Sequence, residues 1–404
     1  MKHAEIARYF LKLGFLGFGG PLALMVAFQR DLVGPGRWMS LERFSQALAL
    51  IKALPGPTAT QLAIYLGFIR GGRIGGALAG ICLIAPAFFM MVGLAAFYAS
   101  VESFAWSKPI LFGMQAAALG VILDGLWRLA QPLVRERSFW VTTLSAALIT
   151  LYKPSLEPIA IVGSGLFGVW FLAYQTTRKD KVGKLFSLGS TLTAITGSGV
   201  SDAQAKNLAV AAAATTATAT AAAASPGISI LLGQLAAVGL KAGLFVFGTG
   251  LAIVPLLAHD VVEQHKWLTH AQFMDALAFG QITPGPVVIT MTFIGYKVAG
   301  LAGAIVATIS IFAPAFFNIL TWFPIAEKKL AGSPYARSFS IFALGAVVGS
   351  IFIAVIRLAS NVSHGTTHPE AWVLAGLAFL IALKTKVPVW ITIPLGGLVG
   401  FVSM

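Results

Sequence analysis

Two Pro-Gly-Pro tripeptides, each set inside an apolar stretch, constrain this chain more than any other feature. The first is Pro55-Gly56-Pro57, and the second is Pro284-Gly285-Pro286, 229 residues later. Proline lacks the backbone N–H and disfavours helical backbone at the preceding residue, so an α-helix ends at each tripeptide. Broken backbone at membrane depth persists only where protein buries it or a cavity solvates it. The helix that starts after each break directs free N–H groups and the positive end of its dipole inward, which predicts an anion site.

Composition places the chain in a membrane. Of its 404 residues 57% are hydrophobic and only 10% are charged, and several apolar runs reach spanning length. We therefore expect an all-α polytopic membrane protein surrounded by a lipid bilayer. The net charge of +14 matches the accumulation of basic residues in cytoplasmic loops, so no nucleic-acid partner is expected. The single cysteine, Cys82, and six scattered histidines predict no disulfide, no metal site and no cofactor.

The second Pro-Gly-Pro belongs to a repeat that covers most of the chain. A shift of 229 residues brings identical residues into register: Lys12 with Lys241, Phe18-Gly19 with Phe247-Gly248, and Asp31 with Asp260. These paired positions indicate a tandem duplication. We expect a first transmembrane repeat over 1–175, a basic and then Ala/Thr-rich linker over 176–225, and a second transmembrane repeat over 226–404.

Basic residues of the two repeats favour opposite sides of the membrane. In the first repeat they flank the Pro-Gly-Pro element: Arg30, Arg37, Arg43, Arg70 and Arg73. In the second they lie in the alternate loops: Lys328, Lys329, Arg337, Lys384 and Lys386. This reversal predicts two homologous inverted-topology repeats with broken, re-entrant helices. The sequence leaves open whether the first helix crosses or re-enters, and whether the Ala/Thr-rich tract 203–224 spans the membrane.

Paired broken helices in inverted repeats are typical of secondary transporters, whose site lies between the repeats. Lys52 stands three residues before the first Pro-Gly-Pro, and Gln281 occupies the equivalent position. A charge at membrane depth predicts a functional role, with a lysine that reaches the interface as the structural alternative. The glycine-rich breaks either unwind the first helix of each repeat or allow close helix packing. The expected substrate-binding residues are Gly19, Gly20, Lys52, Pro55, Gly56, Pro57, Thr58, Gln61, Gly248, Thr249, Thr283, Pro284, Gly285 and Pro286.

Three further charged residues are candidates for ion pairing or for coupling to a second ion. Asp124 and Arg128 are four residues apart on one helix face, which favours a structural ion pair over a proton relay. Arg357 aligns with Arg128 but has no acidic residue at the position that matches Asp124. It therefore serves either the substrate or the packing of helices.

The motifs Phe18-Gly19-Gly20-Pro21 and Pro55-Gly56-Pro57-Thr58, their counterparts in the second half, and the paired Ala-Pro-Ala-Phe-Phe segments resemble the chromate ion transporter (CHR) family in its long, two-domain form. The resemblance implies a multi-pass carrier of the bacterial inner (plasma) membrane that can form a homodimer. It also implies chromate export driven by the membrane potential or proton motive force, and chromate resistance. The second half departs from the first by carrying Thr249-Gly250 in place of Gly20-Pro21.

The alternatives are a carrier of sulfate or another tetrahedral oxyanion, and an anion channel. A membrane-embedded enzyme or receptor is less consistent with the residues, because no nucleophile with a base, acidic metal cluster or phosphate loop is recognisable. A dianion that leaves a negative-inside cell gains roughly 4.6 kcal/mol per 100 mV, or about 2.3 per charge. Export can therefore run on the membrane potential alone, whereas uptake needs protons or sodium.

Overall fold

The computed structural model describes residues 2–185, 226–248, 250–330, 333–363, 369–385 and 387–403. The regular structure in these ranges is helical, apart from one isolated β-bridge between Val33 and Met39. Six helical segments in them are long and apolar enough to span a membrane: Thr58–Val101, Ser107–Ala130, Pro154–Thr176, Gly227–Phe245, Val287–Lys329 and Pro334–Ser360. The prediction of an all-α polytopic membrane protein is confirmed. Thr249 and the Ala/Thr-rich tract lie outside the described residues.

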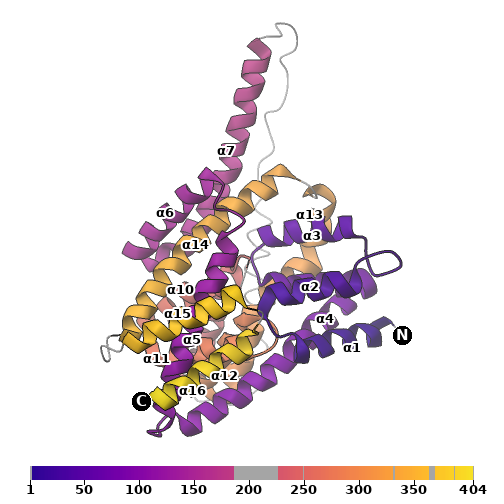
Figure 1. The fold of residues 1–404 in the computed structure, drawn as a ribbon. Coiled ribbons are helices and arrows are strands. Elements are labelled where there is room, and N and C mark those ends of the chain that lie inside the picture. The colour runs from indigo at the N-terminus through magenta and orange to yellow at the C-terminus, as the bar shows by residue number, and fades with distance from the viewer. Residues whose placement is uncertain are drawn as a thin grey trace.

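The first half begins with short helices and continues with long ones (Figure 1). Its elements are α1 (Lys2–Leu16), α2 (Gly20–Leu32), α3 (Leu41–Ala53), α4 (Thr58–Val101), α5 (Ser107–Ala130), α6 (Arg137–Tyr152), the 3-10 turn η1 (Pro154–Leu156) and α7 (Glu157–Leu185). Helix α7 continues past residue 175, the expected end of the first repeat, and projects from the rest of the molecule.

The second half repeats this order with a less regular start. Its elements are α9 (Pro226–Phe245), η2 (Gly250–Ile253), α10 (Val254–Leu257), the π-helix η3 (Ala258–Gln264), α11 (His270–Ile282), η4 (Val287–Ile289), α12 (Thr290–Phe317), the π-helix η5 (Asn318–Trp322), α13 (Phe323–Leu330), α14 (Pro334–Ser363), α15 (Pro369–Lys384) and α16 (Val389–Ser403). Helix α11 starts at a capping box, in which Thr269 and Gln272 satisfy each other's backbone N–H groups.

Helices α4 and α12 each reverse direction at a glycine. Gly72 has φ 65° and Gly300 has φ 59°, a left-handed region that side chains with a Cβ rarely adopt. The first arm of α4 folds back on the second so closely that a Cβ on Gly67 would overlap the carbonyl oxygen of Gly75. Each long helix is therefore a hairpin with one short arm and one long arm.

The short helices of the first half form two hairpins that open at the same end of the molecule. Glu5, near the start of α1, accepts hydrogen bonds from Trp38, which follows α2, and from Arg70, which ends the short arm of α4. Tyr9 of α1 donates to Asp31 near the end of α2. Helix α1 is therefore one arm of a hairpin and returns through α2.

The long arms of α4 and α12 connect the two sets of hairpins. Glu327, in α13, accepts from Arg43 at the start of α3 and from Tyr65 in the short arm of α4. Glu102, just after α4, accepts from Gln272 at the start of α11 and from Lys297 in the short arm of α12. The hairpins of the two halves thus open at opposite ends of the long arms. We name these the Glu327 end and the Glu102 end.

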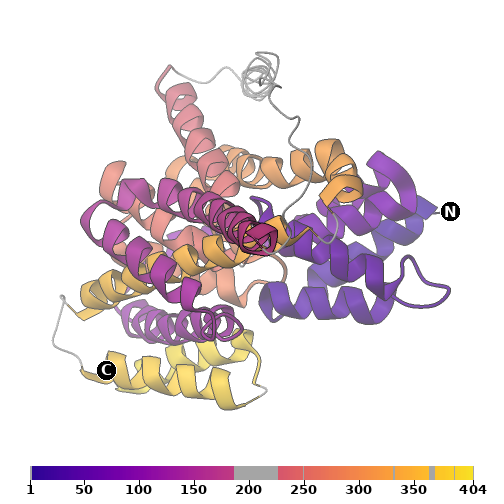
Figure 2. The ribbon, with the colours of Figure 1, turned by 90° about the horizontal axis from the view of Figure 1, so that it is seen from above.

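The helices assemble into two bodies. The hairpin body comprises α1–α4 and α9–α13, in which α1 packs on α4, α9 on α12, and α4 on α12. The bundle body comprises α5–α7 and α14–α16, in which α6 and α7 pack on α14, and α15 and α16 pack on α5. In Figure 2 the N-terminal hairpins, in indigo, and α15 and α16, in yellow, lie on separate flanks of the molecule. Each body contains elements of both sequence halves.

Candidate functional site

The four helix breaks meet in pairs near the middle of the hairpin body. The N–H of Gly56 donates to the carbonyl of Val246 at 2.7 Å, and the N–H of Gly285 donates to the carbonyl of Gly17 at 3.2 Å. These two bonds are equivalent under the 229-residue shift, so each Pro-Gly-Pro break is held by the glycine-rich break of the other half. The φ values of Gly56 and Gly285, 127° and 101°, require glycine at both positions.

Several predicted substrate-binding groups have protein partners in this state. The carbonyl of Pro55 accepts from the side-chain amides of Gln61, at 2.6 Å, and Asn318, at 2.7 Å. The hydroxyl of Thr283 donates to the carbonyl of Phe279 at 2.7 Å. The two amides stabilise the broken backbone, because they satisfy the carbonyl of Pro55, which the interrupted helix leaves without an intrahelical partner.

A cavity of about 880 Å³ lies between the hairpin body and the bundle body. It brings together seven of the predicted residues: Gly19, Gly20, Lys52, Thr58, Asp124, Arg128 and Gly248. The other described predicted residues do not line it: Pro55, Gly56, Pro57, Gln61, Thr283, Pro284, Gly285, Pro286 and Arg357. Helix α4 begins at Thr58 on the cavity wall, so the positive end of its dipole faces the cavity.

Three donors that have no partner in the described part of the chain face this cavity. The hydroxyl oxygen of Thr58 and the amide nitrogen of Gln281 are buried, and neither has a hydrogen-bond partner among the described residues. The side chain of Lys52 is exposed in the cavity, and no carboxylate of the described chain lies within ion-pair distance of it. Buried polar groups nearly always have a partner, so the donors of Thr58 and Gln281 are available to a ligand that accepts hydrogen bonds.

Arginines lie on the outer part of the same cavity. Arg30 is in the last turn of α2 at the Glu327 end, and its side chain is 74% exposed. Its hydrogen bond to Asp31 lowers the pKa of that carboxyl, so the pair stays ionised. Arg128 bonds Asp124 at 2.7 Å and the carbonyl of Ala382 at 2.7 Å. The cavity therefore opens at the Glu327 end through a basic rim.

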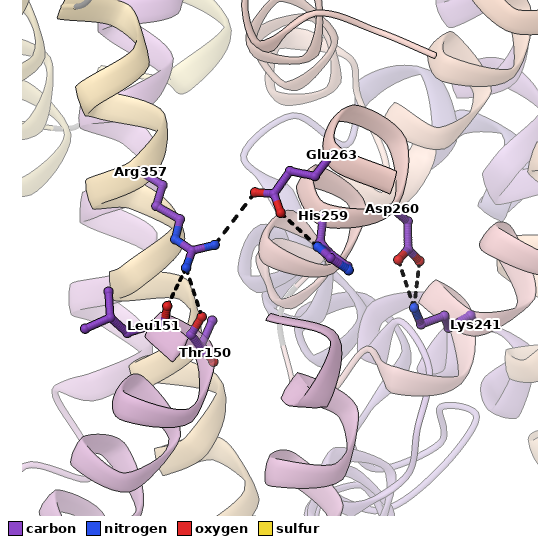
Figure 3. A network of polar contacts seen from close by, with 7 residues as sticks. All are labelled: Thr150, Leu151, Lys241, His259, Asp260, Glu263 and Arg357. Atoms are coloured by element: carbon purple, nitrogen blue, oxygen red, sulfur yellow. Dashed lines mark hydrogen bonds and ion pairs between the residues drawn. The ribbon is translucent and has the colours of Figure 1, made fainter. Parts of the chain in front are cut away.

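Arg128 and Arg357 occupy equivalent places but face different surroundings. Arg128 donates to the last turn of α15, in the cavity wall, whereas Arg357 donates to the carbonyls of Thr150 and Leu151 at the end of α6 (Figure 3). Each arginine thus caps the C-terminal end of a helix from the other half. One oxygen of Asp124 accepts from Arg128, and the other is buried without a partner in the described chain. The negative charge of this carboxylate in the cavity wall is therefore only partly neutralised.

Sequence reasoning did not select Gln281 or Arg30 as site residues, and both line the cavity. The repeat contained the signal for Gln281, because a shift of 229 residues places it on Lys52. For Arg30 the sequence shows only a basic loop residue, and the hairpin formed by α1 and α2 is what brings it to the cavity.

Comparisons with known proteins place this architecture in a family. The family model described as "Chromate transporter" matches residues 4–169 and residues 233–401. The "Probable chromate transport protein" of Synechococcus elongatus is 34% identical over 408 residues, which cover 98% of this chain and 95% of the relative. The "Chromate transport protein" of Cupriavidus metallidurans is 35% identical, with 88% of this chain and 82% of the relative covered.

A third relative, the "Chromate transport protein" of Pseudomonas aeruginosa, is 31% identical, with 99% of this chain and 92% of the relative covered. No solved structure matches the chain. The family model covers most of both halves, and the three relatives align over most of their own length. The chain therefore belongs to the chromate transporter family.

Proposed function

We propose that this protein is a secondary transporter that exports chromate by binding it between the two bodies. The observation that carries the proposal is the cluster of Lys52, Thr58 and Gln281, three donors in one cavity that have no partner among the described residues. A tetrahedral dianion offers acceptors in several directions, which suits donors from both halves and the N-terminus of α4. The names of the family and of the relatives support chromate as the cargo.

The distribution of charge supports a cytoplasmic Glu327 end. Basic residues gather there in the α2–α3 connection, at the reversal of α4 and around α13: Arg30, Arg37, Arg43, Arg70, Arg73, Lys328, Lys329 and Arg337. The described part of the Glu102 end has fewer basic residues, namely Lys108, Lys153, Lys241, Lys266, Lys297 and Arg357. By the positive-inside rule the cavity opens to the cytoplasm. This state is ready to load a cytoplasmic anion, and the membrane potential drives a dianion outward.

We also propose that the two halves are inverted repeats and that the site opens alternately to the two sides of the membrane. The hairpins of the halves open at opposite ends, and the breaks bind one another through equivalent hydrogen bonds. Such an arrangement allows one body to rock against the other around a fixed site. The basic rim formed by Arg30 and Arg128 raises the local concentration of anions at the cavity mouth.

The test measures chromate uptake into inside-out vesicles that hold an inside-positive potential. We expect wild-type uptake to collapse with an uncoupler and Lys52→Ala to abolish it. Lys108→Ala removes an exposed lysine and should leave uptake unchanged. Wild-type rates in well-folded Lys52→Ala would exclude Lys52 from the site.

Two further measurements separate chromate export from the alternative functions. Strong competition by excess sulfate would make sulfate-class oxyanions the general cargo, and flux that never saturates would indicate a channel. Loss of Cr(VI) absorbance without accumulation in the vesicles would favour an enzyme.

A further inference from the structure

The cavity has a closed counterpart at the Glu102 end of the molecule, where the bundle body meets the hairpin body. The π-helix η3 carries His259, Asp260 and Glu263, and all three are paired (Figure 3). Asp260 accepts from Lys241 of α9 at 2.8 and 2.9 Å. Glu263 contacts His259 at 2.9 Å and Arg357 of α14 at 3.7 Å. The ion pair between Glu263 and Arg357 joins the two bodies.

The repeat shows that this interface is the equivalent of the open cavity. Under the 229-residue shift η3 corresponds to the end of α2, and α14 corresponds to α5. Between α2 and α5 lies the cavity, and the side chain of Asp31, near the end of α2, is 31% exposed. Between η3 and α14 the bodies touch, and the side chain of Asp260 is 2% exposed. One interface is thus present twice, open at one end and closed at the other.

Glu157 is a buried carboxyl at this closed interface that the proposed transport site does not use. It is the first residue of α7 and is 2% exposed, and its Oε2 atom has no partner among the described residues. It interacts electrostatically with Asp260 and Lys241, across the boundary between the bodies. Both hydrogen bonds that Lys241 donates go to Asp260, so Glu157 has no ion-pair partner among the described residues.

Other charged groups near this end are already engaged or face outward. Arg357 of α14 holds Glu263 and two carbonyls of α6, and His259 holds Glu263. Tyr152 of α6 and Lys153 after it are exposed. An ionised Glu157 would thus be a buried, unpaired charge beside Asp260, which is strongly unfavourable. The neutral carboxyl is the form compatible with the closed interface.

We propose that Glu157 is a proton-binding site that controls opening of the Glu102 end. The proton is bound while the bodies touch, and it leaves to water at that end when they separate. This inference rests on the proposed alternating access, and it assigns no net movement of protons across the membrane. Low pH at the Glu102 end then favours the closed interface, and high pH favours the open one. The site gives a transporter sensitivity to pH on the side where its cargo is released.

Hydrogen exchange of the η3 backbone tests this without any cargo. Protection of these amides falls when the interface at the Glu102 end opens. The ratio of the exchange rates of the wild type and Glu157→Gln at each pH removes the intrinsic pH dependence of hydrogen exchange. We expect equal exchange at acid pH. At alkaline pH the wild type should exchange faster, by up to about tenfold per pH unit, the limit for one proton. Glu136→Gln, which alters an exposed glutamate at the Glu327 end, should behave as the wild type.

A ratio between wild type and Glu157→Gln that stays constant with pH would overturn the proposal. If Glu157→Gln does not fold, Glu157→Asp decides, because a shorter acid should shift the midpoint of the pH dependence and an unchanged midpoint would refute it. Chromate uptake into inside-out vesicles is measured in parallel at fixed pH. If the wild type takes up no chromate, the proposed function is refuted, whereas the hydrogen-exchange result still decides the role of Glu157.

Discussion

Exchanging the two equivalent polar residues of the cavity tests whether both halves form one site. Lys52→Gln keeps a hydrogen-bond donor but removes the charge. A hydrogen bond to a charged group contributes about 1.5–3 kcal/mol and a neutral one about 0.5–1.5, so the loss is about 1–1.5 kcal/mol. That difference corresponds to roughly a tenfold fall in kcat/KM for chromate. Adding Gln281→Lys returns the charge to the same cavity from the other half, and we expect the double variant to recover most of the loss.

The assay is the initial rate of chromate uptake into inside-out vesicles over a range of concentrations, normalised to folded protein. Gln281→Lys alone should lower KM, because two lysines then face the anion. It should also lower kcat, because the more tightly bound chromate is released more slowly. A double variant no better than Lys52→Gln, with both proteins folded, would refute a shared site. Full activity of Lys52→Gln would refute the role of the charge.

Four other changes have distinct expected results. Thr58→Val removes a buried hydroxyl that lacks a partner among the described residues, so it should raise KM by about fivefold or more without lowering the melting temperature. Gly56→Ala should lower the melting temperature more than Gly36→Ala, since both have positive φ but only the former Cβ would overlap Gln61. Glu263→Gln should weaken closure of the Glu102 end by about 1 kcal/mol or less, measured by hydrogen exchange of η3. Arg357→Gln should also destabilise the protein, because it leaves the α6 carbonyls without a donor.

Helix breaks and the repeat could be predicted from the sequence, because both depend on local chemistry. Proline and glycine interrupt helices wherever they occur, and a fixed shift exposes a duplication. The return of α1 through α2 could not be predicted with the same ease. It depends on contacts between residues far apart in the chain, such as Glu5 with Arg70, and on the reversal at Gly72, which hydropathy cannot detect inside an apolar run.

The candidate site was predictable in part for the same reason. Lys52 and Thr58 are conspicuous, since a charge and a helix start stand beside a break in an apolar run. Which groups of a break face the cavity depends on their partners. Gly56, Gln61 and Thr283 have the right chemistry for an anion, yet each makes a bond within the protein. Glu157 was missed because its environment consists of α7, α9 and η3 together.

In the proposed alternating access, a single motion of the two bodies serves both ends. Glu327 and Glu102 tie the mouths of the hairpins to the ends of the long arms of α12 and α4, so the hairpin body tilts as a unit. Its boundary with the bundle body contains the cavity at one end and the contact between Glu263 and Arg357 at the other. A tilt that closes the first must separate the second, because both lie on the same boundary on either side of the crossed breaks. In the proposed mechanism, rigid geometry therefore makes access at the two ends mutually exclusive, and the charges of each end only decide which state is favoured.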